Sequence, residues 1–437
     1  MKLIKQYKEV FILGIGGSGM SSIAKYLKQR GALVKGYDQR TSYITNLLEN
    51  DGVRTYQDMD NKIYNKDVLY VISSAFKIED TFLKNYKTKE NVMTRPKFLD
   101  LLSKEVDIIG ITGSHGKTST TALIAHIFHF NNKNVSYIYG GVNSFGNIGG
   151  HFGDENYPLV LETDEAFNTF ENIEIDNLLV TNIDNDHLDY FGNFFNLVKA
   201  FNEVINKVKH TVVINNDDDN LNKIQNDNLL TYGENDEVDI KIIEPNVISY
   251  QGNNYKVDSV LIGKHYLSNI AGAIAICGLY ELSISEILEA ISTFSGVKRR
   301  MEYIGTYNNV KFYDDYGHHP TEIKATITAL KNKTSGKLFV IFQPHRFSRT
   351  RDNFQHLQES LKDADFAVVT DIYSAGEEPI PGISSKNFKG ENIKYIKSLR
   401  SVPIYIKDNI TSEDNVLTLG AGDVTLLGPQ ILKYLHD

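Results

Sequence analysis

A glycine-rich stretch that contains Lys-Thr, GITGSHGKTST beginning at Gly110, carries the residues best suited to phosphate chemistry. The apolar run VDIIGIT before it predicts a buried parallel strand, and TTALIAHIF after it predicts a helix. Unpaired N–H groups at such a helix start can face the phosphates of a nucleotide. Lys117 would then reach the terminal phosphates, and the Thr118 or Ser119 hydroxyl would reach Mg²⁺. The sequence therefore predicts an ATP site, although an ordinary turn with an exposed lysine has the same letters.

Acidic residues follow two further predicted strands. YPLVLETDEAF places Glu162, Asp164 and Glu165 after an apolar run, and NLLVTNIDNDHLDYFG places Asp184 and His187 after another. A carboxylate at a strand end beside a phosphate loop is typical of a magnesium ligand. An acidic loop exposed to solvent is the competing interpretation of each cluster alone.

A second glycine pattern lies near the N-terminus, in EVFILGIGGSGMSSIAKYLKQRG. The spacing G-x-G-G-x-G is typical of a diphosphate bound at a helix start, and Asp38 ends the next predicted strand, where it could hold a ribose hydroxyl. Ser73 ends a later strand, at the sheet edge where ligands bind. NAD and a UDP-sugar both offer the diphosphate, so an NAD-dependent oxidoreductase is one alternative.

Composition limits the class of protein. A chain of 437 residues is too long to fold around a single hydrophobic core, and its length suggests two to four domains. A net charge of −9 argues against a general nucleic-acid binder. The single cysteine, Cys277, excludes an internal disulfide and suggests a reducing compartment. We see no signal-peptide pattern and no apolar run of membrane-spanning length, so we expect a cytoplasmic protein.

Alternating strands and helices predict three α/β domains: a Rossmann-like domain over 1–104, a P-loop ATPase-type domain over 105–297 and a second Rossmann-like domain over 298–437. In the middle segment, GGVNSFGNIGGHFG is expected to be a polar loop outside the core. In the last segment, DDYGHHPTEI and FQPHRFSRTRD place charged residues directly after strands, where α/β sheets carry their sites.

Seven motifs together resemble one family. They are GIGGSGMSSIA, GSHGKTSTTALIA, TNIDNDHLDYFG, GVKRRMEYIG, DDYGHHPTEI, FQPHRFSRTRD and LGAGD, and they cover essentially the whole chain. The chain resembles the Mur ligases of peptidoglycan synthesis, and within them the branch that adds L-alanine to UDP-N-acetylmuramate. The resemblance implies that ATP phosphorylates the substrate carboxylate and that the amine of alanine then attacks the acyl phosphate. It implies UDP-N-acetylmuramate, L-alanine, ATP and Mg²⁺ as ligands, and leaves the oligomeric state unknown.

The resemblance also implies roles for individual residues. The expected catalytic residues are Lys117, His187 and Arg349. The expected metal ligands are Thr118, Glu162 and His187. The expected nucleotide contacts are Gly113, Ser114, His115, Gly116, Lys117, Thr118, Ser119, His265, Asn269, Arg300 and Asp314. The expected substrate contacts are Gly16, Gly17, Ser18, Gly19, Asp38, Ser73, Tyr316, His318, Arg346 and Arg349.

Two departures keep alternatives open. The family usually has E-A-D-E-S-D-G-S-F where this chain has ETDEAFNTF, and H-N-x-x-N where Tyr266 follows His265. The altered acidic loop is compatible with a ligase that attaches a murein tripeptide to the same nucleotide, or with a degenerate binding protein. The SRTRD motif resembles the alanine branch, and Lys117, Glu162, His187 and Arg349 argue against degeneracy. Lys199 is the nearest match to the modified lysine of other Mur ligases, and we assign it no role.

Overall fold

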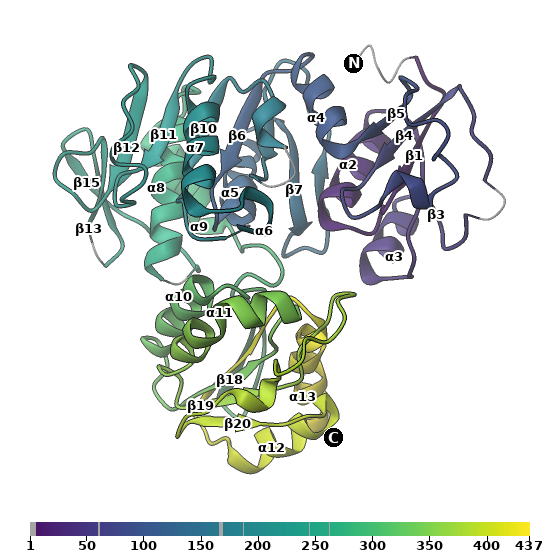
Figure 1. Ribbon diagram of the computed structural model, residues 1–437. Helices are drawn as coiled ribbons and strands as arrows, with labels where there is room; N and C mark the ends of the chain where they lie inside the picture. The colour runs from purple at the N-terminus through teal and green to yellow at the C-terminus, as the bar shows by residue number, and fades with distance from the viewer. Residues whose placement is uncertain (1–5, 60–61, 166–168, 187, 244, 262) are drawn as a thin grey trace. The chain divides into compact units, whose positions relative to one another are not determined.

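The computed structural model describes residues 6–59, 62–165, 169–186, 188–243, 245–261 and 263–437. The chain forms two compact units. The first comprises Met1–Val260 and Leu267–Ser295, and the second comprises Leu261–Tyr266 and Gly296–Asp437. Each unit contains largely parallel sheet covered by helices, which confirms the α/β class predicted from the sequence (Figure 1).

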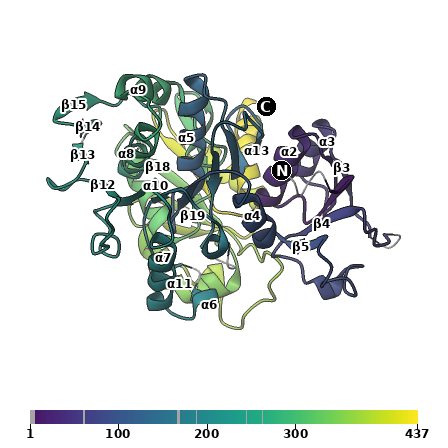
Figure 2. The ribbon, with the colours of Figure 1, turned by 90° about the horizontal axis from the view of Figure 1, so that it is seen from above.

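The first unit begins with a parallel sheet in the order β3-β2-β1-β4-β5. Its strands are β1 (Glu9–Leu13), β2 (Leu33–Tyr37), β3 (Arg54–Tyr56), β4 (Val68–Ile72) and β5 (Val92–Thr94). Its helices are α2 (Ser18–Gln29), α3 (Tyr43–Asn50) and α4 (Arg95–Ser103). Helices α2 and α3 lie together beside this sheet (Figures 1 and 2). The glycine motif lies between β1 and α2, as the sequence predicts.

The same unit contains a second sheet in the order β15-β14-β13-β12-β11-β10-β6-β9-β7-β8. Its strands are β6 (Ile108–Thr112), β7 (Ser136–Val142), β8 (Ile148–His151), β9 (Leu159–Glu162), β10 (Asn177–Val180), β11 (Val212–Asn215), β12 (Leu229–Gly233), β13 (Ile240–Ile243), β14 (Val247–Tyr250) and β15 (Asn253–Lys256). Its helices are α5 (Lys117–Phe130), α6 (Leu188–Phe191), α7 (Phe194–Ile205), α8 (Lys264–Gly278) and α9 (Ile284–Thr293). The central strands β7, β9, β6, β10, β11 and β12 are parallel.

The prediction of a polar loop after β7 is wrong in part. Residues Ile148–His151 form β8, which pairs antiparallel with β7. Gly149 and Gly150 are buried there. The backbone of α2 lies so close to Gly150 that an added Cβ would be 2.0 Å from the Ser22 carbonyl oxygen. Glycine therefore serves close backbone packing at this position rather than loop flexibility.

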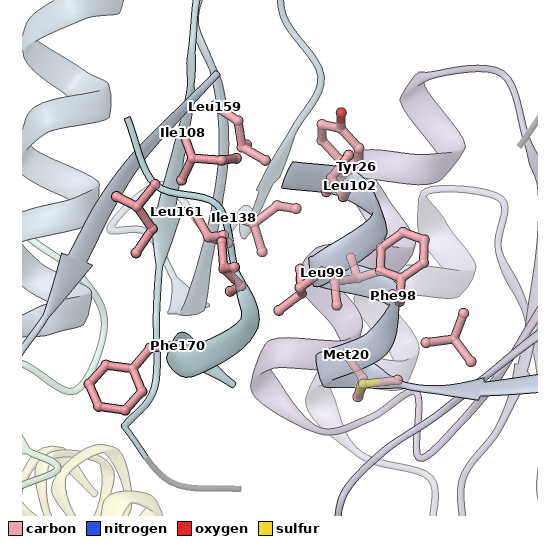
Figure 3. Packing of buried hydrophobic residues seen from close by; sticks show 14 of the residues in the cluster. Met20, Tyr26, Phe98, Leu99, Leu102, Ile108, Ile138, Leu159, Leu161 and Phe170 are labelled. Atoms are coloured by element: carbon pink, nitrogen blue, oxygen red, sulfur yellow. The ribbon is translucent and has the colours of Figure 1, made fainter. Parts of the chain in front are cut away.

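One hydrophobic core joins the two sheets of the first unit. Met20 and Tyr26 of α2 and Leu99 of α4 belong to the same buried cluster as Ile138 of β7 and Leu161 of β9 (Figure 3). The apolar faces of α2 and α4 are thus buried against the second sheet as well as the first. Such shared burial stabilises the two sheets as a single body.

Polar contacts reinforce this junction. The Ser22 hydroxyl donates a buried hydrogen bond of 2.6 Å to the Tyr139 carbonyl oxygen. At the far end of α2, Arg30 forms an ion pair of 2.7 Å with Glu155 and lies over the Phe152 ring. Helix α2 is therefore held on β7 and β8 along its length.

The second unit is a sheet in the order β16-β17-β21-β18-β19-β20, in which only the β16–β17 pairing is antiparallel among the described strands. The strands are β16 (Glu302–Tyr307), β17 (Val310–Asp315), β18 (Leu338–Phe342), β19 (Phe366–Val369), β20 (Ile393–Tyr395) and β21 (Asn415–Leu419). Helices α10 (Pro320–Lys331) and α11 (Phe347–Ser360) bury one face, and α12 (Val402–Asn409) and α13 (Leu427–His436) bury the other (Figure 1).

The first two predicted domains thus lie in one compact unit, and the boundaries at 104/105 and 297/298 stay a prediction. Cys277 is buried in α8, as expected for a structural thiol. In the part of the chain that is described, no helix has both the length and the apolar character needed to cross a membrane.

Replacing Gly150 by alanine should destabilise the first unit. The added methyl group has to push β8 away from the α2 backbone, and overpacking of this kind costs about 1–3 kcal/mol of unfolding free energy. Urea unfolding of Gly150→Ala against wild type measures this loss. Gly278→Ala is the matched control, because its Cβ would meet only the Tyr250 hydroxyl at 3.5 Å. Equal stability of Gly150→Ala and wild type would contradict the close packing of α2 on β8.

Candidate functional site

The predicted phosphate loop lies between β6 and α5, and its backbone needs glycine at two positions. Gly113 has a φ of +128° and Gly116 a φ of +86°. An added Cβ on Gly113 would lie 2.2 Å from the Thr181 hydroxyl, and one on Gly116 would lie 2.8 Å from Asn269 Oδ1. Gly116 caps α5 without a side-chain hydrogen bond. The start of α5 is therefore shaped for an external anion.

The loop after β10 holds the phosphate loop in place. The Thr181 hydroxyl donates to the His115 carbonyl oxygen at 2.6 Å, and the His115 N–H donates to Asn182 Oδ1 at 2.9 Å. The Asp184 N–H donates to the Ser114 hydroxyl oxygen at 2.8 Å, and the Asp184 carboxylate lies 2.9 Å from His115 Nε2. Asp184, one of the acidic residues noted in the sequence, thus helps to fix the conformation of the phosphate loop. His187 lies outside the described residues, so its predicted role as metal ligand and catalytic residue stays a prediction.

Lys117 is mostly buried and ion-paired. Its ammonium donates to Glu165 Oε2 at 2.9 Å, and the two side chains are 12% and 2% exposed. Burial would lower the pKa of Lys117, but the carboxylates of Glu165, Asp164 and Glu162 outweigh it and raise the pKa. Glu165 is absent from the predicted site residues. The only signal for it in the sequence was its position shortly after a predicted strand.

Glu162 and Thr118, two of the predicted metal ligands, lie together. The Thr118 hydroxyl donates to Glu162 Oε1 at 2.9 Å, and the Gly140 N–H donates to Oε2 at 2.6 Å. Burial, with a contribution from Asp164, raises the pKa of Glu162. A buried carboxylate beside a hydroxyl is an oxygen-rich donor set that suits a hard cation such as Mg²⁺. These residues therefore fit the metal that the sequence predicts. Ser119 is buried in the first turn of α5.

The N-terminal glycine loop is closed by its own aspartate. Asp38 Oδ2 accepts a hydrogen bond of 2.9 Å from the Gly16 N–H, so this carboxylate shapes the loop as well as being a predicted ribose contact. Gly17 caps α2 without a side-chain hydrogen bond, and Ser18 and Gly19 form the first turn. Ser73 lies on the neighbouring strand end, where an added Cβ on Gly14 would lie 2.8 Å from it.

This loop and the predicted metal carboxylate meet at one residue. An added Cβ on Gly140 of β7 would lie 3.3 Å from Ser18 Oγ and 3.6 Å from Glu162 Oε2. The packing of α2 on β7 therefore brings the start of α2 beside Glu162. In the first unit, the predicted diphosphate loop and the predicted ATP site form one continuous region.

The second unit gathers its predicted residues at the strand ends of its sheet. Tyr316 and His318 follow β17, and their rings contact each other with centroids 5.2 Å apart. His345 follows β18, 5.7 Å from His318 by ring centroids and stacked on Tyr373. Arg346 forms a 2.7 Å ion pair with Glu377. His345 and Glu377 are not among the predicted residues, although the density of charge in QPHRFSR indicated this loop.

A strained turn before β16 carries two arginines. Arg299 and Met301 have φ values of +61° and +49°, a conformation that glycine usually takes. The Arg299 and Arg300 guanidinium groups lie 5.0 and 5.1 Å from the Tyr316 ring centroid. Asp315 fixes the turn by accepting from the Met301 N–H at 2.7 Å, and burial raises the pKa of Asp315 to about 6.

Asp314 and His265 are also placed in the second unit. Asp314 is buried and accepts hydrogen bonds of 2.6 Å from the hydroxyls of Thr418 and Thr425. Its carboxylate therefore connects strands within this unit, and its predicted nucleotide contact stays a prediction. Burial lowers the pKa of His265 to about 4. Asn269, its partner in the predicted motif, belongs to the first unit, where it lies against Gly116.

Family comparisons cover nearly the whole chain. Residues 9–106 match the family model described as Mur ligase family, catalytic domain, residues 111–277 the Mur ligase middle domain, and residues 299–422 the Mur ligase, glutamate ligase domain. The chain belongs to the Mur ligase family. The resemblance stated from the sequence motifs is thereby confirmed.

Individual members of the Mur ligase family are similar over full length. The chain is 34% identical to the UDP-N-acetylmuramate–L-alanine ligase of Desulforamulus reducens, over 100% of both chains. It is 33% identical to the ligase of the same name from Rickettsia felis, over 95% of this chain and 94% of that one.

Solved Mur ligase structures share the fold. The UDP-N-acetylmuramate-alanine ligase of Thermotoga maritima aligns with a TM-score of 0.82 at 24% identity, over 98% of this chain and 99% of that one. A murein peptide ligase from Psychrobacter arcticus aligns with a TM-score of 0.69 at 22% identity, with the same coverage. Identities this low speak for the fold alone.

Removing the charge of Glu165 should destabilise the protein strongly. Glu165→Gln leaves the Lys117 ammonium buried without its nearest carboxylate, and breaking a buried pair costs about 3–5 kcal/mol. Equilibrium urea unfolding measures the loss, and the double variant Lys117→Met/Glu165→Gln should recover much of it. Glu203→Gln is the control, because the Lys199–Glu203 pair is exposed and 3.7 Å apart. Equal losses for Glu165→Gln and Glu203→Gln would refute the buried pair.

His345 should contribute to stability in a pH-dependent way. Burial lowers its pKa to about 4, with Arg349, Arg346 and Arg299 adding to the shift and Glu377 opposing it, and the rings of His318 and Tyr373 flank it. An unfolded histidine has a pKa of about 6.5, so the folded protein binds fewer protons between pH 4 and 6.5. Neutral His345 therefore adds stability above pH 6.5 that is lost as the pH falls toward 4.

Denaturation at pH 7 and pH 5 tests this expectation. Wild type should lose about 1–2 kcal/mol more unfolding free energy than His345→Gln over this interval. His356→Gln, which changes an exposed histidine of α11, should behave like wild type. A parallel loss in His345→Gln and wild type would show that His345 does not resist protonation.

Proposed function

We propose that this chain joins L-alanine to the carboxylate of UDP-N-acetylmuramate, with ATP as the energy source and Mg²⁺ as the metal. The observation that carries the proposal is the continuous region in the first unit, where Lys117, Thr118 and Glu162 lie beside the first turn of α2. Two anions, a carboxylate and a terminal phosphate, have to meet in this reaction. The full-length relatives named for this activity support the substrate assignment.

The residues of the chain would divide the work as follows. The backbone of the phosphate loop and Lys117 bind the phosphates, and Glu165 keeps the Lys117 ammonium in place. Thr118 and Glu162, with His187, would hold Mg²⁺, which neutralises charge on the transferring phosphoryl group. The glycine loop from Gly14 to Gly19 takes the diphosphate of the sugar nucleotide at the start of α2.

The chemistry then proceeds in two steps. A carboxylate oxygen of the substrate attacks the terminal phosphorus and ADP leaves, which gives an acyl phosphate. The amine of alanine attacks the acyl carbon, phosphate departs with the electron pair of the broken C–O bond, and the nitrogen gives up one proton, which the departing phosphate can accept. Arg349 is the proposed partner of the alanine carboxylate, because a guanidinium fork fits a carboxylate. Tyr316, His318 and Arg346 complete the proposed amino-acid site in the second unit.

We also propose that the protein acts in the cytoplasm.

Phosphate release tests the proposal. Purified protein with ATP, Mg²⁺ and UDP-N-acetylmuramate should release phosphate when L-alanine is added, and Lys117→Met should lose at least about 100-fold in turnover, since a preorganised charge in such a site contributes several kcal/mol. Lys199→Met, at an exposed position, should retain activity. Release with a murein tripeptide in place of L-alanine would assign the chain to the tripeptide-adding reaction. No release with either acceptor would reject the ligase function.

A further inference from the structure

Arg95 has an unusual position in the first unit. It is the first residue of α4, directly after β5, and its guanidinium lies close to Gly19 in the first turn of α2. An added Cβ on Gly19 would lie 3.1 Å from both Nε and Nη2 of Arg95. A side chain at position 19 would crowd the guanidinium, so glycine there lets this cation lie beside the first turn of α2.

The hydrogen bonds of Arg95 do not use all the N–H groups of its guanidinium. Its side chain is 14% exposed, and Nη1 donates to Asp164 Oδ2 at 2.7 Å. Its Nε is buried without a hydrogen-bond partner among the described residues. A buried N–H of a charged group without a partner is costly in a folded protein, and a bound water, ion or ligand is one explanation for it. Asp164 therefore holds the guanidinium through Nη1, while Nε, on the edge that faces Gly19, has no hydrogen-bond partner among the described residues.

The surroundings identify the anion. Asp164 lies two residues beyond Glu162, the predicted metal ligand, and Ser18 of the same α2 turn lies against Gly140, which donates to Glu162. Arg95 thus lies between the start of α2, where the sugar nucleotide binds, and the carboxylate beside the phosphate loop. The group that has to reach this place in the proposed reaction is the carboxylate of the muramoyl substrate.

We propose that Arg95 binds the carboxylate of UDP-N-acetylmuramate through the edge that carries Nε and holds it at the first turn of α2, beside Glu162. This inference rests on the proposed function. A guanidinium matches a carboxylate in geometry and charge. Asp164 fixes the arginine from the opposite side, so little side-chain freedom is lost when the substrate binds.

Calorimetric titration of the full-length protein with two nucleotides tests this role. UDP-N-acetylglucosamine has the same nucleotide and N-acetylglucosamine ring as UDP-N-acetylmuramate but lacks the lactyl ether that carries the carboxylate. Arg95→Gln should weaken UDP-N-acetylmuramate binding about tenfold or more, which corresponds to one charged hydrogen bond, and leave UDP-N-acetylglucosamine binding unchanged. Arg95→Lys keeps the charge without the fork, and should give a smaller loss.

The control is Arg30→Gln, because Arg30 also joins the two sheets of the first unit through an ion pair but lies at the other end of α2. It should bind both nucleotides as wild type does. An equal loss for both nucleotides in Arg95→Gln would assign Arg95 to the diphosphate and overturn the proposal, as would no loss for either or the same loss in Arg30→Gln. Wild type that binds UDP-N-acetylmuramate no better than UDP-N-acetylglucosamine would instead count against the proposed function.

Discussion

The contact between the backbone of α2 and β8 is the constraint on which the first unit depends. Gly150 allows the Ser22 carbonyl to approach where any side chain would overlap it. This approach buries the apolar face of α2 on the second sheet, and it sets the start of α2 beside Glu162. Two loops from different sheets therefore share one region because of packing, before any ligand contributes binding energy.

The acidic side chains of that region each have a polar or cationic partner. Glu162, Asp164 and Glu165 come from one strand end, and they pair with Thr118, Arg95 and Lys117 respectively. Buried charges without partners would be prohibitively costly, so the acids hold the cations in place in the folded protein. Phosphoryl transfer between anions needs cations that are already positioned. The acidic strand end therefore holds cations in place for the proposed anion site, which its own charge alone would not suggest.

The sequence allowed the elements of this site to be predicted, but not most of its pairings. Strand, glycine turn and helix follow from local patterns, so the phosphate loop, the first glycine loop and the Thr118–Glu162 pair lie where expected. Arg95 and Glu165 were missed because their partners are 69 and 48 positions away. The same reason explains the error at β8: a glycine-rich stretch indicates a loop unless a neighbouring backbone lies against it, and the neighbour, α2, is more than 100 residues earlier.

In the second unit, several arginines surround a histidine. Arg299, Arg346 and Arg349 act on His345, and a protonated imidazole there would add another positive charge to the group. Under the proposed function, the amino acid brings a carboxylate that arginines attract and an ammonium that they repel. A histidine kept neutral by burial and by these arginines offers the ammonium a polar neighbour without charge repulsion. Burial first, and then Arg349, Arg346 and Arg299, thus lower the pKa of His345 and keep it neutral beside the proposed amino-acid site.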